Sequence, residues 1–308
     1  MKLKMILKHE ESDFWRIRNF LREVFLLNNK VEHSWHVARL DYWRWHFIKT
    51  CELIDDFPNV TATWQTGDGK ICAVLHPIAH DEVRLHIHPQ FRTPELEKEV
   101  FSYALEKFHD KLEDGRRYVY VPIFQSDNLR KEVLSRMDFN IQPGWGHHYW
   151  HDLDGSLPPR INPSGYEIRS MGSEDEHPAR SWASWRAFHP DELDEDYSGH
   201  SWYQNLQSAP LYRRDLDIVA ATSDKKIAAF CTIFYDDFTR SAVTVVVGTD
   251  ASYWRHGLGK AVIIEGMHRL KKLGCTRVFS TAHEEPADAL YGSLMQNMSI
   301  TDSWVKVF

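Results

Sequence analysis

The sequence is poor in cysteine and has no long apolar run. Its four cysteines are scattered, without the close spacing of zinc ligands or of a disulfide framework. We therefore expect free, mostly buried thiols in a reducing cytoplasm. No apolar stretch is long enough to cross a bilayer, and no signal-peptide pattern is present. These absences favour a cytoplasmic protein without a membrane partner.

Basic residues are fewer than acidic residues. The net charge is −7, which argues against a nucleic-acid partner. At 308 residues the chain exceeds the usual size of one domain, so two domains are the default expectation. An apolar content of 43% is enough for sizeable cores. We expect a two-domain protein that is a monomer or a homodimer.

Histidine is frequent, and two groups of histidines imitate a metal site. His86 and His88 alternate on one face of an expected strand, and His147, His148 and His151 lie close together in the sequence. No cysteine or carboxylate stands at a helpful spacing beside them. Because the chain has 18 histidines, coincidental clustering is the favoured interpretation, and we expect no metal.

The most informative stretch runs from Ala242 to Gly274. Residues 242–247 form an apolar, β-branched run of strand length. Residues 258–273 place apolar side chains on one helical face, and Gly274 ends the helix. Between the two lies a basic loop with two glycines, YWRHGLGK at 253–260.

A strand, a glycine loop and a helix start together predict an anion site. The first amides of a helix lack internal partners, and the helix dipole adds partial positive charge there. We expect a pyrophosphate to be held by Arg255, His256, Gly257, Leu258, Gly259 and Lys260. Ala261 stands where a P-loop has Ser or Thr, and the third glycine of a dinucleotide fingerprint is missing. Neither kind of nucleotide is therefore favoured.

The same stretch resembles the GNAT family of N-acetyltransferases. The pyrophosphate loop of that family reads Arg/Gln-x-x-Gly-x-Gly/Ala, and residues 255–260 nearly fit it, with Trp254 at the usual first Arg/Gln position. Downstream, Ala289-Leu290-Tyr291 matches the Ala-x-x-Leu-Tyr element of the family.

The first half of the chain has the same order of elements and resembles a degenerate copy of the second. Its loop at 88–96 has no glycine, and Pro94 and Glu95 are unsuited to a pyrophosphate. The resemblance implies an α+β protein of two tandem GNAT-like domains, each a mixed, mostly antiparallel sheet flanked by helices. Mycothiol synthases are similar in this respect. We expect a degenerate domain at 1–152, a Gly-, Pro- and Ser-rich linker at 153–165, and an acyl-CoA-binding domain at 166–308.

The resemblance also implies the chemistry: an amine attacks the thioester of acetyl-CoA directly. A backbone N–H from Val245, Val246 or Val247 would hold the carbonyl oxygen. Tyr291 is the candidate acid, because a phenol with a pKa near ~10 can donate a proton to the departing thiolate. The alternative is that Tyr291 only packs its helix on the sheet.

The general base is absent from its usual strand. Many family members carry a Glu there, but residues 242–247 contain no carboxylate. The open alternatives are a water chain or one of the side chains of His283, Glu284, Asp237 and His189. The acidic run at 191–196 is either a solvated loop or an attraction for a cationic amine.

Two functions remain in view. The first is an N-acetyltransferase that acylates a primary amine of a small molecule. The second is a non-catalytic acyl-CoA-binding or regulatory protein. The missing strand carboxylate favours this second function.

Overall fold

The computed structural model describes residues 3–308, except for the side chains at 143–145. These residues divide into two compact units. Unit 1 comprises Met1–His147 and Ser299–Phe308, and unit 2 comprises His148–Met298. No helix in the described part of the chain is long and apolar enough to span a membrane.

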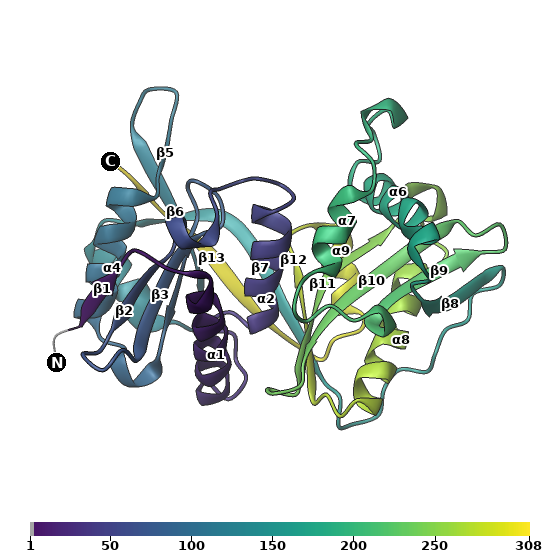
Figure 1. Ribbon diagram of the computed structural model, residues 1–308, viewed down its shortest axis with the longest axis horizontal. Coiled ribbons are helices and arrows are strands. Elements are labelled where there is room, and N and C mark those ends of the chain that lie inside the picture. Colours follow the sequence, from purple (N-terminus) through teal and green to yellow (C-terminus); the bar gives the residue numbers. More distant parts are fainter. Residues whose placement is uncertain (1–2) are drawn as a thin grey trace. The chain divides into compact units, whose positions relative to one another are not determined.

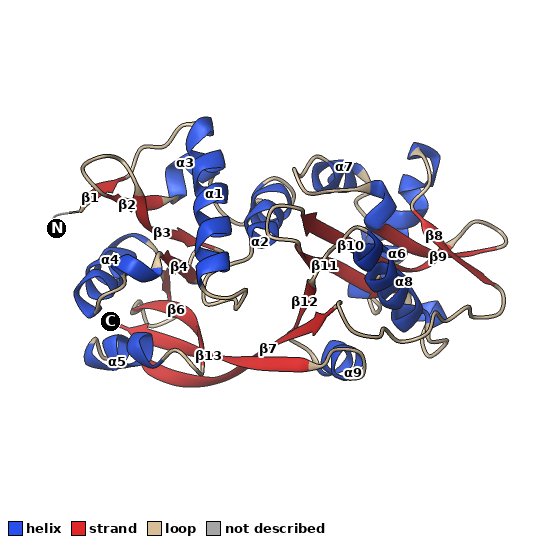
Figure 2. Ribbon diagram, turned by 90° about the horizontal axis from the view of Figure 1, so that it is seen from below, coloured by secondary structure: helices blue, strands red, loops and turns tan. Residues whose placement is uncertain are grey.

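Unit 1 contains an antiparallel sheet in the order β1-β2-β3-β4. Figure 2 shows α1 on one face of this sheet and α4 on the other. The α4 face carries an apolar core to which Trp64, Leu85 and Phe101 contribute. The elements are β1 Lys4–Ile6, α1 Glu11–Leu27, α2 Val37–Tyr42, α3 Phe57–Val60, β2 Ala62–Gln65, β3 Ile71–Pro77, β4 Val83–Ile87, α4 Pro94–Lys107, β5 Asp110–Lys111, β6 Arg117–Phe124, α5 Asn128–Arg136 and β7 Asn140–Asp152.

Unit 2 contains a mixed sheet in the order β7-β12-β11-β10-β9-β8 (Figure 1). The strands from β8 to β11 pair antiparallel, and β11 pairs parallel with β12. This mixture of sheet and helix confirms the predicted α+β class. The elements are β8 Tyr166–Ser170, α6 His177–Phe188, α7 Ser201–Gln207, β9 Asp217–Thr222, β10 Ile227–Asp236, β11 Ser241–Thr249, α8 Leu258–Lys272, β12 Arg277–Ala282, α9 Glu285–Gly292 and β13 Asn297–Val307.

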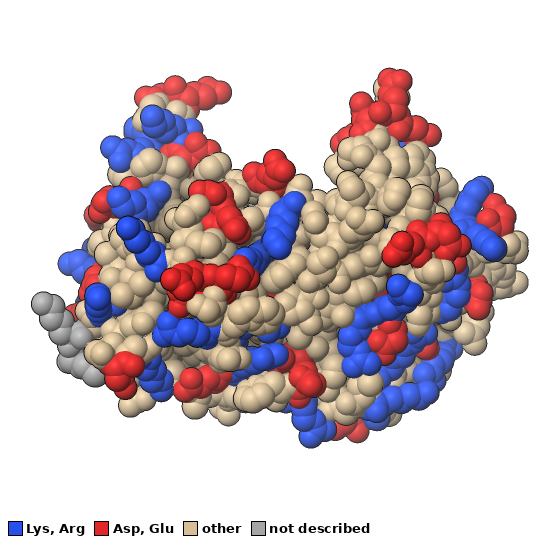
Figure 3. Space-filling model, viewed as in Figure 1, with Lys and Arg blue, Asp and Glu red and all other residues tan. Residues whose placement is uncertain are grey.

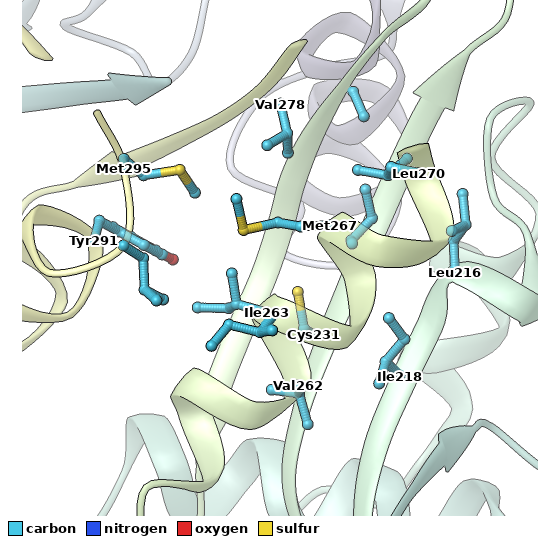
Figure 4. Packing of buried hydrophobic residues seen from close by; sticks show 14 of the residues in the cluster. Leu216, Ile218, Cys231, Val262, Ile263, Met267, Leu270, Val278, Tyr291 and Met295 are labelled. Atoms are coloured by element: carbon cyan, nitrogen blue, oxygen red, sulfur yellow. The ribbon is translucent and has the colours of Figure 1, made fainter. Parts of the chain in front are cut away.

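The helices of unit 2 cover opposite faces of its sheet. Cys231 of β10 packs in the cluster beneath α8, whereas the next residue, Thr232, accepts a hydrogen bond from Arg180 of α6 at 3.1 Å. Successive side chains of a strand point to opposite faces, so α8 and α6 lie on different sides. Figure 4 shows the α8 side, where Val262, Ile263 and Met267 of α8 meet strand side chains.

Two long strands carry residues of both units. β7 begins in unit 1, and its last residues, from His148 on, belong to unit 2, where β12 is its neighbour. β13 begins in unit 2, but its residues from Ser299 on belong to unit 1. There it pairs antiparallel with β6, from Thr301 opposite Phe124 to Val307 opposite Tyr118.

The exchange of strands bears on the sequence-based division at residues 152 and 166. The compact units change at His147, and the final strand, β13, belongs to unit 1 from Ser299 on. Trp304 of this strand is 5% exposed and belongs to the core of unit 1. The boundaries of independently folding domains stay a prediction.

Candidate active site

The strand–loop–helix stretch adopts the predicted local structure. β11 is rich in β-branched residues, and Asp250 ends it by accepting a hydrogen bond from the Ser252 amide at 2.9 Å. The chain then makes a short 3₁₀ turn and enters α8 at Gly257, whose φ of +75° is left-handed. A residue with a Cβ is strained in that conformation, which accounts for glycine at this position. We refer to residues 250–260 as the α8 loop.

The α8 loop presents a row of open amides. Among the residues that the structure describes, none accepts a hydrogen bond from the backbone N–H groups of residues 255–260. The first hydrogen bond of the helix is donated by Ala261 to the Gly257 carbonyl at 3.1 Å. Open amides at a helix N-terminus attract anions. The predicted residues Arg255 to Lys260 therefore lie together around one potential anion site.

The cations of the α8 loop have no acidic partners. Within residues 3–308, no carboxylate lies within ion-pair distance of Arg255 or Lys260. His256 is hydrogen-bonded to the Tyr166 hydroxyl, which lies 3.3 Å from its Nδ1. In a protein with a net charge of −7, unpaired cations beside open amides favour a strongly anionic ligand. Figure 3 shows Lys and Arg side chains gathered over the region of α8.

β11 and β12 diverge next to the α8 loop. Their paired residues end at Val243 and Phe279, although β11 continues to Thr249 and β12 to Ala282. We call the diverging parts the splay. The register between β10 and β11 skips Val245, because Thr232 faces Val246 and Ile233 faces Thr244. Val245 is thus a bulge, and such a residue lacks its ladder partner. The predicted carbonyl-binding segment Val245, Val246 and Val247 lies along this splay.

Tyr291 lies in the cluster beneath α8, from where its ring points toward Cys231 and Ile263 (Figure 4). The side chain is 6% exposed. Burial raises the pKa of the phenol above its usual range, Cys231 adds to this, and the Thr244 hydroxyl opposes it. A phenol in this environment keeps its proton at neutral pH, as a proton donor must.

Two further groups near Tyr291 escaped the sequence reasoning. The Thr244 and Ser280 hydroxyls, one from each strand of the splay, lie 2.7 Å apart. The Tyr149 hydroxyl donates to Asp288 Oδ1 at 2.6 Å, and the Tyr149 and Tyr291 rings are 6.2 Å apart. Burial, aided by Asp288, raises the pKa of Tyr149 to about 12. No sequence pattern marks these pairs, because their members are far apart in the chain.

The four candidate bases lie at different places, and His283 and Glu284 directly follow the splay at the end of β12. Asp237 lies in the turn before β11, at the opposite end of that strand from the α8 loop. His189 stacks on Trp185 at 4.1 Å, and its Nδ1 lies 2.7 Å from Glu192 Oε1. His283 and Glu284 are exposed residues just before α9. None of these positions distinguishes one of them as the base.

The acidic run at 191–196 is fully exposed, on the connection from α6 to α7. In Figure 3, acidic side chains cover the tip of this connection. The exposure agrees with the interpretation as a solvated loop.

In unit 1, the loop between β4 and α4 is filled by side chains of the protein itself. Glu97 of α4 is fully buried and lies 2.6 Å from Arg92 Nε and 3.1 Å from Arg130 Nε. Asp127 is a second partner of Arg92. Arg92, just before α4, and Arg130 of α5 are thus neutralised by internal carboxylates, in contrast to the unpaired cations of the α8 loop.

In the described part of the chain, no three His, Cys, Asp or Glu side chains are arranged to hold a metal ion. His86 faces His76 across β3 and β4, with their Nε2 atoms 3.0 Å apart. His88 instead caps the following turn by accepting from the Gln90 amide at 3.2 Å.

Comparison with known proteins relates both halves to one fold. The profile of a family described as Acetyltransferase (GNAT) family matches residues 179–295. No curated protein sequence matches the chain. A GCN5-related N-acetyltransferase from Sphaerobacter thermophilus aligns with a TM-score of 0.64 at 14% identity, covering 98% of this chain and 95% of that one.

Two further solved structures align over nearly the whole chain. A tandem GNAT protein from the clavulanic acid biosynthesis pathway gives a TM-score of 0.66 at 12% identity, covering 99% of this chain and 98% of that one. A GNAT-family acetyltransferase from Colwellia psychrerythraea gives 0.59 at 12% identity, with 99% and 100% covered. At such low identity, these likenesses concern the fold.

Proposed function

Because the chain belongs to the GNAT superfamily, as an acyltransferase of the tandem-domain type, we propose that it transfers the acetyl group of acetyl-CoA to a primary amine of a small molecule. The family as a whole uses acetyl-CoA. The finer assignment to this co-substrate and to a small amine rests on the residues of unit 2. We place the reaction in the cytoplasm, since the four cysteines are free thiols.

The row of open amides in the α8 loop is the observation that carries this proposal. A CoA diphosphate needs several donors converging from one side, and residues 255–260 offer them without internal competition. Arg255 and Lys260 add unpaired positive charge. The residues present therefore fit the pyrophosphate of CoA.

The splay supplies the second requirement, a gap in the sheet beside that loop. A thioester lying between β11 and β12 meets the bulge at Val245 on one side and the buried phenol of Tyr291 on the α8 side. The bulge offers backbone groups to the carbonyl, and the phenol offers a proton to the thiolate. Both groups act on the thioester, which favours catalysis over simple coenzyme binding.

The contacts in unit 1 favour the binding of a single coenzyme per chain, in unit 2. Glu97 and Asp127 already neutralise Arg92 and Arg130. We expect isothermal titration of the full chain with acetyl-CoA to give a stoichiometry of one. Two equivalent sites would contradict this assignment of unit 1.

The proposal is tested by replacing Gly257 with valine. A branched side chain is strained at a φ of +75°, so the α8 loop must rearrange and acetyl-CoA binding should be lost. The matched control is Gly115→Val, which meets similar strain at a φ of +87° in the turn between β5 and β6 and should leave binding intact. Binding is measured by titration, and turnover by thiol release from acetyl-CoA over a panel of amines. Unchanged affinity in Gly257→Val would refute the loop assignment, and binding without thiol release on any amine would favour the non-catalytic function.

A further inference from the structure

The splay between β11 and β12 begins at two buried hydroxyls. The last residues that pair in the parallel ladder are Val243 and Phe279. In the next residue of each strand, Thr244 Oγ1 and Ser280 Oγ lie 2.7 Å apart, and both side chains are buried. We call Thr244 and Ser280 the hydroxyl pair. A side-chain hydrogen bond thus joins the two strands at the point where their backbones separate.

Alternation along the strands places the hydroxyl pair on the same face of the sheet as Tyr291. The residues two places earlier, Ala242 and Val278, belong to the cluster beneath α8. Side chains two residues apart in a strand point to the same face. Tyr291 is a member of that cluster, and its phenol interacts with the Thr244 hydroxyl. Ser280, Thr244 and Tyr291 therefore form a row of three hydroxyls inside an apolar environment.

The contacts of the hydroxyl pair allow both of its hydrogens to turn toward the phenol. A hydroxyl has one hydrogen to donate and can accept from two neighbours. Among the residues that the structure describes, Thr244 is the hydrogen-bond partner of Ser280 Oγ. A further neighbour of Thr244 Oγ1 is the Phe279 carbonyl oxygen at 3.4 Å, which is long for a hydrogen bond between oxygens. Ser280 can therefore donate to Thr244 while Thr244 donates to the phenol oxygen.

A buried phenol needs such donors if it is to act as an acid. An ordinary phenol has a pKa near ~10 and an ordinary thiol one near ~8.5, so moving a proton from the phenol to a thiolate is uphill. Burial and the nearby Cys231 raise the pKa of Tyr291 further, whereas the Thr244 hydroxyl lowers it. A hydrogen bond donated to the phenolate stabilises the charge, which the surrounding apolar side chains do not. The hydroxyl pair thus makes the proton transfer less unfavourable.

We propose that the hydroxyl pair positions Tyr291 as the acid and stabilises the phenolate that it leaves, an inference that rests on the proposed acetyl transfer. The neutral amine nitrogen forms the bond to the thioester carbon, and the C–S bond breaks. The sulfur leaves with the electron pair of that bond and takes the proton of Tyr291. Thr244 donates a hydrogen bond to the phenolate and Ser280 donates one to Thr244, and neither hydroxyl loses its proton. The nitrogen gives one proton to solvent, and the phenolate takes one from solvent after the thiol has left.

The experiment compares Thr244→Val with wild type in single turnovers, using acetyl-CoA and an amine that the wild type accepts. Valine keeps the branched shape and removes the hydroxyl. A hydrogen bond to a charged group is worth roughly 10- to 100-fold, so the rate of thiol release should fall by a factor in that range, with the Kd of acetyl-CoA unchanged. Thr244→Ser keeps a hydroxyl and should restore most of the rate. Ser280→Ala acts through Thr244 and should lower the rate by a smaller factor, roughly 2- to 10-fold.

The matched control is Ser241→Ala. The Ser241 hydroxyl is also buried and lies 2.7 Å from a threonine hydroxyl, that of Thr239, but at the opposite end of β11 from the α8 loop. Its removal should leave the rate of thiol release unchanged. A fall as large as that of Ser280→Ala would show that the effect does not depend on contact with the phenol, and would overturn the inference.

A double variant with both Thr244→Val and Tyr291→Phe separates a positioning role from a structural one. If the hydroxyl pair acts through the phenol, removing the Thr244 hydroxyl should cost nothing further once the phenol hydroxyl is gone. A structural role would instead lower the rate by the same factor in both backgrounds. Ser280→Ala, combined with Tyr291→Phe in the same way, gives a second cycle that does not depend on the folding of the Thr244 variant.

Two results would count against the hydroxyl pair in different ways. Equal factors in the two backgrounds, or a wild-type rate in Thr244→Val, would overturn this inference and leave the acetyl transfer standing. A wild type that binds acetyl-CoA but releases no thiol with any amine would overturn the acetyl transfer, and the role of the hydroxyl pair with it.

Discussion

The buried imidazoles of His76 and His86 form a chain in which every proton position is determined. The Trp35 amide donates to His86 Nδ1 at 3.3 Å, so His86 carries its proton on Nε2. His76 Nδ1 lies 3.1 Å from the Pro77 carbonyl and must donate to it, so its Nε2 accepts from His86. Both rings are therefore neutral, and an additional proton breaks one of these bonds.

This pair makes unit 1 sensitive to acid. Burial lowers the pKa of His76 from 6.5 to about 3, and burial, with the nearby His76, Arg130 and Arg84, holds the pKa of His86 well below 6.5. At pH values below 6.5 but above these lowered pKa values, the unfolded chain binds protons that the folded chain does not. The free energy of unfolding therefore falls as the pH drops below 6.5. Each of the two histidines lowers the free energy of unfolding by about 1.4 kcal/mol for each pH unit in that range.

Urea unfolding at several pH values between 7 and 5 measures this dependence. His86→Gln should reduce the slope of stability against pH, because it removes a titrating group and breaks the bond to His76. The exposed His80, replaced by asparagine, serves as the control and should keep the wild-type slope. An equal slope in wild type and His86→Gln would show that the pair does not set the acid response.

Tyr291→Phe tests the acid. Removing the hydroxyl leaves the ring packed in the cluster beneath α8 but takes away the proton that we propose for the thiolate. The rate of thiol release should fall by roughly 10²-fold or more, with the Kd of acetyl-CoA nearly intact. A wild-type rate would remove Tyr291 from the chemistry and leave it as a packing residue.

At the residue scale, the sequence predicted groups that act within one segment and missed pairs that form between segments. The residues predicted to bind an anion, Arg255 to Lys260, are contiguous, so the sequence alone could suggest them as one group. The partner of His86 is His76, and Thr244 meets Ser280, because neighbouring strands bring them together. A single sequence does not specify strand register, and such pairs therefore stay hidden from it.

Among the elements, α8 packs on β10 through a glycine. A Cβ at Gly266 would clash with the Ile233 side chain, and it would lie 3.2 Å from Ile218 Cδ1. Gly266→Ala should therefore destabilise unit 2 by about 1–3 kcal/mol, despite the better helix propensity of alanine. Thermal unfolding measures the change.

The control for Gly266 is Gly259→Ala, in the first turn of the same helix. A Cβ there meets its nearest neighbours at 3.5 Å, an ordinary contact, so the melting temperature should not fall. A loss of stability as large as that of Gly266→Ala would show that helix glycines matter here for a reason other than close packing.

The elements themselves were largely predictable, because amphipathic periodicity is local. The helix expected at 258–273 is α8, Leu258–Lys272, and the sequence of residues 96–108, which also predicts a helix, corresponds to α4, Pro94–Lys107. The aromatic-rich residues 34–47 predict one further helix, but the structure has the short α2, which continues as a π-helical turn over Trp43–Ile48. The bulge at Val245 was also missed, since the apolar run of β11 reads as an unbroken strand.

For the whole molecule, the final strand should be essential to unit 1. Trp304 opposes Val121 of β6 and is buried in the core of this unit. Trp304→Ala should cost about 3–5 kcal/mol. Hydrogen exchange should report the loss in β6, with β10 of unit 2 less affected. Val307→Ala, at a position 38% exposed, is the control and should leave exchange in β6 unchanged.

The exchange of strands between the two units is the feature that the sequence predicted least. The composition of residues 153–165 indicates a linker, and a linker suggests that each half is complete on either side of it. The run at 301–308 has the periodicity of a strand but carries no information about which sheet receives it. Only pairing with β6 decides this, and that pairing joins residues almost two hundred positions apart.

The placement of β13 has a consequence for the order of events during synthesis. The first half of the chain leaves the ribosome well before residues 299–308, which pair with β6 of unit 1. At the usual rate of translation, the remaining half takes roughly 10–30 s to make. During that interval β6 has an unpaired edge, open to other chains. Ribosome-bound nascent chains that stop short of residue 299 should therefore recruit chaperones at unit 1, and release of the finished polypeptide should end that recruitment.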